Sequence, residues 1–254
     1  MGYTSLFFRE RDLTPGQAEE TAAAVLQNFG YTRFDPFSGI PGRAYPQTTK
    51  LFIAPPLAGW VRVLAEAIND DIVLALSEKA GLVYARLEGS QGSIDAWRDR
   101  AHLDLQADYG ITAEKITVIQ PPPKASGDWM DALPDEIKAM QKHPQQAAKM
   151  IDRLSGSLLA KAGGGDQREQ AMALLSSDAE ADWSSAAGKT ILSTLAALGI
   201  QNGISPDFAT LRDAYALHAR RKRRPGAKLL PGDENTLESV PNALQYLPVY
   251  AGKG

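Results

Sequence analysis

The sequence contains no cysteine. Disulfides, thiolate metal sites and cysteine nucleophiles are therefore excluded, and a reducing compartment is favoured. No stretch approaches the roughly 18 consecutive apolar residues that a membrane-spanning helix needs. Residues 1–10 also lack the basic segment followed by an apolar run that is typical of a secretory signal. We therefore expect a soluble, cytoplasmic protein with no membrane partner.

Neither sign of charge is in large excess. The 254 residues include 27 Lys and Arg and 30 Asp and Glu, which gives a formal net charge of −3. This balance is too close to neutral to predict a nucleic-acid partner for the protein as a whole. The hydrophobic fraction of 44% predicts a core of ordinary size. A chain of this length predicts one large or two modest domains.

Residues 1–120 alternate between strand and helix patterns. Thr14, Pro15 and Gln17 form the signature of a helix start, and Gly30 is typical of a helix end. The predicted strands cover residues 3–8, 51–54, 60–64, 82–87, 94–97 and 116–119, and two further helices cover residues 70–80 and 99–108. The resulting order (strand, helix, two strands, helix, two strands, helix, strand) favours a mixed sheet with helices on one or both faces.

The three prolines at 121–123 mark the clearest boundary, because they stop both helix and strand. We predict an α/β domain over 1–120, a Pro-rich linker over 121–127 and a mostly helical domain over 128–254. Helical stripes such as Ile191, Leu192, Leu195 and Leu198 indicate an irregular helical bundle, which ends in an extended C-terminal tail. The predicted fold class is therefore α+β.

No catalytic or cofactor motif is complete. Residues 187–190 match the end of the phosphate-binding motif GxxxxGK followed by Ser or Thr, but Trp183 stands where the first glycine belongs. A helix with a glycine near its start explains these residues. The histidines, His102, His143 and His218, have no metal-binding spacing. We therefore assign no cofactor, metal or catalytic residue, and lean towards a protein that is not an enzyme.

The first candidate contact surface is the segment 31–45, which is rich in Gly, Pro and aromatic residues. Phe34, Phe37 and Tyr45 would supply apolar area for recognition, and Arg43 would suit a protein or acidic ligand. The alternative is that the rings pack beneath the segment as a small core.

The second candidate surface is the basic segment 218–228. Its candidate binding residues are Arg220, Arg221, Lys222, Arg223 and Arg224. The alternative is that these cations stabilise a helix C-terminus or pair with Asp233 and Glu234. The sequence leaves the exposure of this cluster open.

The favoured hypothesis is a non-enzymatic interaction or accessory protein that binds a protein partner through the 31–45 loop, the 218–228 segment, or both. One alternative is nucleic-acid or phosphate-ligand binding through the basic helix end, which the lack of interleaved aromatic residues makes less favoured. Another alternative is a hydrolase with a spatially assembled site. The partner and the oligomeric state stay open.

Overall fold

The computed structural model describes residues 2–38, 44–109, 180–226 and 228–254. These residues belong to one compact unit that is built from residues 1–121 and 179–254. The predicted strand at 116–119, the Pro-rich linker at 121–127 and the first helices of the C-terminal half lie outside the described residues. The described part of the C-terminal half packs in the same unit as the sheet.

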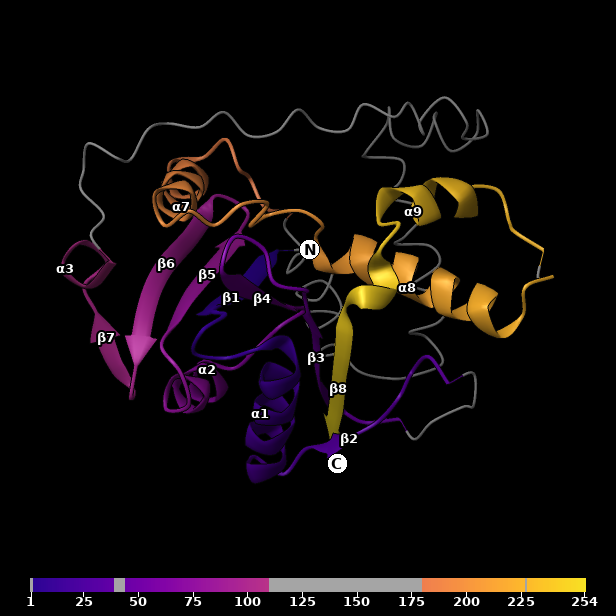
Figure 1. Ribbon diagram of the computed structural model, residues 1–254, viewed down its shortest axis with the longest axis horizontal. Coiled ribbons are helices and arrows are strands. Elements are labelled where there is room, and N and C mark those ends of the chain that lie inside the picture. Colours follow the sequence, from indigo (N-terminus) through magenta and orange to yellow (C-terminus); the bar gives the residue numbers. More distant parts are fainter. Residues whose placement is uncertain (1, 39–43, 110–179, 227) are drawn as a thin grey trace, which may run out of the picture. The chain divides into compact units, whose positions relative to one another are not determined.

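An eight-stranded sheet in the order β2-β8-β3-β4-β1-β5-β6-β7 forms the centre of this unit (Figure 1). The strands are β1 (Tyr3–Arg9), β2 (Thr32–Arg33), β3 (Gln47–Ile53), β4 (Trp60–Ala65), β5 (Leu82–Glu88), β6 (Gln91–Arg98), β7 (Ala101–Leu103) and β8 (Leu247–Lys253). The α+β class is confirmed. Every described pairing is antiparallel, so the sheet is not the mixed sheet that the sequence predicted. Short connections join β3 to β4 and β5 to β6 to β7, and such connections permit only antiparallel pairing.

The described helices are α1 (Pro15–Asn28), α2 (Asp70–Ser77), α3 (Leu105–Tyr109), α7 (Ala186–Ala197), α8 (Phe208–Arg223), α9 (Asp233–Ser239) and the 3-10 turn η2 (Ala243–Gln245). The predicted start and end of α1 are confirmed. The Thr14 amide donates to Gln17 Oε1 at 3.0 Å, and the Thr14 hydroxyl accepts from the Gln17 amide at 3.4 Å. Gly30 ends this segment with a φ of +81°. None of the helices in the described ranges has the length and apolar character to cross a membrane.

The predicted helix over 99–108 is wrong in its first half. Asp99 and Arg100 adopt positive φ angles of 51° and 63° and form a tight turn. The chain then pairs back on β6 as β7, with Arg98 opposite Ala101. Strand pairing satisfies the backbone polar groups that a helix would otherwise satisfy. The helix therefore begins only at Leu105.

The sheet buries both faces. Leu6 and Phe8 point to the face that α1 and α2 cover, and Phe7 points to the opposite face, as the alternation of side chains along a strand requires. On that opposite face, α7 packs over Phe7 and the strands around it, with the predicted stripe on α7 buried. Beside it, α8 and η2 pack over Phe52 and Leu64.

The C-terminal tail becomes strand β8, which lies between β2 and β3. It pairs with β3 over its whole length, from Gln47 opposite Lys253 to Ile53 opposite Leu247. On its other edge it pairs with the two residues of β2. Strand β8 is therefore the second strand from one edge of the sheet.

Arg62 is a buried arginine on the face that α7 and α8 cover, with 8% of its surface exposed. Its Nε donates to Ser5 Oγ at 3.1 Å, and its Nη1 donates to the carbonyl oxygens of Ser205 at 3.0 Å and Asn202 at 3.4 Å. Burial lowers the pKa of Arg62 from its ordinary value. These bonds attach the loop between α7 and α8 to the sheet.

Arg62→Met should lower the free energy of unfolding by about 2–3 kcal/mol, because it removes three hydrogen bonds and leaves the buried Ser5 hydroxyl without its donor. Urea unfolding followed by tryptophan fluorescence measures this change. Arg86→Met is the matched control, since Arg86 also lies on a strand but has a half-exposed side chain that pairs with Asp70. The control should cost less than about 1 kcal/mol. Equal stability of the two variants would contradict the structural role of Arg62.

Candidate functional site

Residues from three parts of the chain enclose a cavity of about 480 Å³ that is open on one side. We call it the α8 cavity. Its lining residues are Arg33, Phe34, Asp35, Pro36, Phe37 and Ser38 after β2, Tyr215, Ala219, Lys222 and Arg223 on α8, Leu244 on η2, and Pro248 and Tyr250 on β8. The volume lies in the range of roughly 300–1,000 Å³ that is usual for ligand sites.

A tight turn places the aromatic wall of the α8 cavity. The Phe34 amide donates to the Tyr250 carbonyl at 2.9 Å, which extends the β2–β8 pairing by one residue. Asp35 Oδ1 then accepts from the Phe37 amide at 2.8 Å, so the carboxylate caps the turn. The Phe37 ring consequently lies 4.6 Å from the ring centroid of Tyr215 and 5.3 Å from that of Tyr250.

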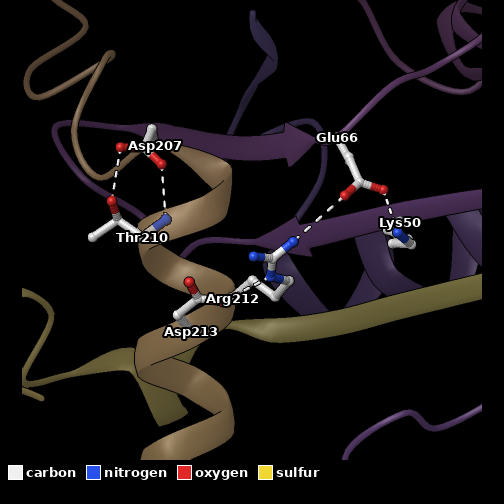
Figure 2. Close-up of polar contacts among 6 residues, drawn as sticks. All are labelled: Lys50, Glu66, Asp207, Thr210, Arg212 and Asp213. Carbon is white, nitrogen blue, oxygen red and sulfur yellow. Dashed lines mark hydrogen bonds and ion pairs between the residues drawn. The ribbon is translucent and has the colours of Figure 1, made fainter. Parts of the chain in front are cut away.

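Helix α8 supplies the opposite wall. Asp207 caps its start, with Oδ1 and Oδ2 accepting from the Thr210 amide and hydroxyl, each at 2.8 Å (Figure 2). The lining residues of α8 are Tyr215, Ala219, Lys222 and Arg223. Their spacing of four, seven and eight residues places them on one helix face. The apolar start of this face and its basic end therefore both border the cavity.

A polar network holds α8 against β3 and the end of β4. Glu66 forms ion pairs with Lys50 and with Arg212, the latter at 3.7 Å, while Arg212 Nε donates to Asp213 Oδ1 at 2.8 Å (Figure 2). The hydrogen bond to Asp213 is the largest of the effects that raise the pKa of Arg212. Since these groups are partly exposed, the network orients α8 more than it stabilises the fold.

The hydroxyl of Tyr250 is buried below the cavity wall without a hydrogen-bond partner in the described part of the chain. Only 3% of the Tyr250 surface is exposed. Burial raises the pKa of this hydroxyl strongly, and the negative charge of Glu66 raises it further. The hydroxyl is therefore a buried polar group that costs stability.

The basic end of α8 is exposed. All five cations from Arg220 to Arg224 are exposed, and no ion pair among the described residues includes any of them. The expected pairing with Asp233 and Glu234 does not occur: Asp233 Oδ2 accepts from the Leu230 amide at 2.8 Å instead. Arg220, Arg221, Lys222 and Arg223 lie in the last turn of the helix and Arg224 is its C-cap residue, where the helix dipole favours cations.

The structure brings part of each predicted surface to the α8 cavity. Phe34 and Phe37 from the first surface line it together with Lys222 and Arg223 from the second. The other three cations of the second surface, Arg220, Arg221 and Arg224, are not among its lining residues.

Tyr45 and Arg43 complete the first predicted surface. The Tyr45 ring stacks on Phe34 with centroids 5.4 Å apart and packs so closely on Gly252 that a Cβ there would lie 2.1 Å from the ring. Tyr45 therefore supports the cavity wall without lining it. Arg43 lies outside the described residues.

Sequence reasoning did not predict the contribution of β8 to the site. Pro248 and Tyr250 line the cavity only because β8 pairs with strands far away in sequence. Tyr215 lies on α8 and is partly buried at the cavity. In the sequence, only the position of Tyr215, one and two helix turns before the basic residues, connects it with the cavity.

The other sequence candidates have structural explanations. Gly188 lies in the first turn of α7, where a Cβ would come within 2.6 Å of the Asp182 carbonyl, so a glycine fits the close packing there. His102 is half-exposed and lies 3.4 Å from Asp95 Oδ1, while His218 Nε2 lies 3.3 Å from the Leu237 carbonyl. His143 lies outside the described residues. In the described ranges, no group of three or more His, Cys, Asp or Glu residues is placed to hold a metal ion.

No family model, no curated protein and no solved structure matches this chain. The function must therefore be argued from the α8 cavity itself. Among its described lining residues, Asp35 is the only carboxylate, and none is a histidine. Aromatic side chains and cations dominate instead, and this chemistry favours binding of an apolar group that carries negative charge.

Tyr250→Phe should raise the free energy of unfolding at pH 7 by about 1 kcal/mol, because it removes a buried hydroxyl without a partner. The free energy of unfolding of the variant should also fall less steeply as the pH rises. Because the pKa of Tyr250 is raised in the folded state, the unfolded state loses the phenolic proton at a lower pH than the folded state does. The wild-type protein therefore loses stability as the pH rises above about 10.

Urea unfolding at several pH values between about 7 and 11 measures both effects. Tyr31→Phe, at a partly exposed ring that follows α1, is the control and should stay within about 0.5 kcal/mol of the wild type at pH 7. A Tyr250→Phe protein that is less stable than the wild type at pH 7 would show that the hydroxyl has a stabilising partner.

Proposed function

We propose that this protein is a non-enzymatic interaction protein that binds a protein partner through the α8 cavity. The observation that carries the proposal is that the two contact surfaces, which lie about 180 residues apart in sequence, border one cavity. The 31–45 loop supplies its aromatic wall, and the basic 218–228 segment supplies its charged rim.

The chemistry of the cavity supports binding in two ways. Its aromatic residues resemble the anchor pockets at the centre of protein interfaces, where buried aromatic contacts dominate affinity. Its exposed cations Lys222 and Arg223 have no ion pair in the described part of the chain. An acidic partner would therefore gain their attraction without first breaking an internal pair.

The proposal predicts that charge reversal at the cavity removes the partner. Lys222→Glu combined with Arg223→Glu should reduce recovery of a stoichiometric protein from nuclease-treated extract of the native host at least tenfold. Arg220→Glu combined with Arg221→Glu is the matched control, because it makes the same change in charge on the same helix turn but away from the cavity. Recovery is measured by quantitative mass spectrometry.

Thermal unfolding of each double variant shows that the fold is retained, as expected for exposed sites. Phe37→Ala tests the aromatic wall independently of charge and should also reduce recovery. Partner recovery that both double variants reduce equally, or that neither changes, would refute the cavity as the binding surface.

The second candidate function is nucleic-acid or phosphate-ligand binding, which the five exposed cations at the end of α8 favour. Phosphate contacts by four or five cations would lower the affinity by about two orders of magnitude between 50 and 200 mM salt. Both double variants would then weaken binding alike, because such contacts spread over the whole basic end. Fluorescence anisotropy with labelled oligonucleotides measures this, and an affinity that is independent of salt would dismiss the candidate.

A further inference from the structure

We propose that the α8 cavity recognises an acidic peptide segment of the partner: one large aromatic side chain enters the cavity, and carboxylates about three residues away face Lys222 and Arg223. This inference rests on the proposed function and names the chemistry of the partner. It follows from the shape of the aromatic wall, the position of the cations and the open side of the cavity.

Phe34, Phe37 and Tyr215 are partly exposed at the cavity, so their rings can contact an aromatic side chain of the partner. The Phe37 ring is tilted by 52° to Tyr215, by 39° to Phe52 and by 79° to Tyr250. Tilted and edge-on contacts are those that aromatic side chains prefer among themselves. Leu244 also lines the cavity. Because 40% of its surface is exposed, it offers a further apolar contact to the ligand.

The cations set the distance between the anchor and its acidic neighbours. Lys222 follows Tyr215 by seven residues on α8, which corresponds to a rise of about 10 Å along the helix. An extended peptide covers this distance in about three residues. Carboxylates at that separation from the anchor can therefore reach Lys222 and Arg223 while the aromatic ring lies beside Tyr215.

Arg33 and Asp35, the other charged residues that line the cavity, also favour a ligand whose carboxylates lie on the α8 side. Arg33 already pairs with Glu19, so its charge is compensated. Asp35, in the turn that faces α8, would repel a carboxylate on its own side of the cavity. The negative groups of the ligand are thus directed to the α8 side.

A peptide fits this site better than a nucleic acid does. Stacking of bases needs flat, open ring faces, whereas the rings here are tilted against one another. The cavity is open to solvent, so a side chain of a peptide can enter it from outside.

The test uses the whole chain and a fluorescein-labelled peptide, Gly-Gly-Ser-Trp-Ser-Glu-Asp, which places both acids on one side of the anchor. Binding is measured by anisotropy at about 150 mM salt, where attraction beyond about 8 Å is screened. We expect saturable binding that weakens at least tenfold when Ala replaces the peptide Trp, and at least tenfold when Asn and Gln replace its acids.

The protein variants locate the binding. Lys222→Glu with Arg223→Glu should weaken peptide binding at least tenfold, and the matched Arg220→Glu with Arg221→Glu control should change it less than threefold. Absence of binding, equal binding of the peptide and N-acetyltryptophanamide, or displacement of the peptide by oligothymidine at equal concentration would each overturn the inference.

Failure of this inference can be told apart from failure of the proposed function. If the peptide does not bind but recovery of the partner still depends on Lys222 and Arg223, the α8 cavity is the interface and the anchor chemistry is wrong. If neither double variant changes recovery of the partner, the proposed function itself is wrong.

Discussion

The pairing of β8 with β3 is the constraint on which the rest of this architecture depends. Seven residues at the C-terminal end of the chain must lie between β2 and β3. Helices α8 and α9 and the turn η2 lie in the same unit as this pairing, and α8 and η2 pack on one face of the sheet. Figure 1 shows α8 and α9 beside the end of β8 where η2 leads into the strand. The antiparallel pairings of β8 also bring residues from opposite ends of the chain into contact, which makes the fold rich in non-local contacts.

The α8 cavity is a consequence of the same constraint. Strand β2 is only two residues long, so the outer edge of β8 beside Pro248 is bordered by the turn at Asp35 and Phe37 rather than by a continuing strand. Helix α8 passes this edge at a position set by the packing of Phe208 and Leu211 on Phe52. The cavity is therefore the space left where a short edge strand ends beside a long helix.

Local signals in the sequence were sufficient for elements whose stabilising contacts are local. The capping box at Thr14 and the apolar stripe from Ile191 to Leu198 depend on neighbours within one or two helix turns, and both were predicted. The turn at Asp99 and the strand position of β8 depend on partners elsewhere in the sheet, so neither could be read from residue spacing. For the same reason, Phe37 and Lys222 were each predicted as contact residues, but nothing in the sequence placed them together.

The basic end of α8 is difficult to explain by stability alone. Cations near a helix C-terminus gain about 0.3–1 kcal/mol each from the dipole, and this gain fades beyond the last turn. Five consecutive cations also create like-charge pairs, such as Arg220 with Arg224 at a spacing of four residues, and each such pair costs about 0.2–0.5 kcal/mol. No acidic side chain among the described residues compensates for this repulsion. One or two cations are enough to interact with the helix dipole, so the remaining positive charge is better explained by the negatively charged partner that we propose. Lys222 and Arg223 are the two of these cations that also line the aromatic cavity.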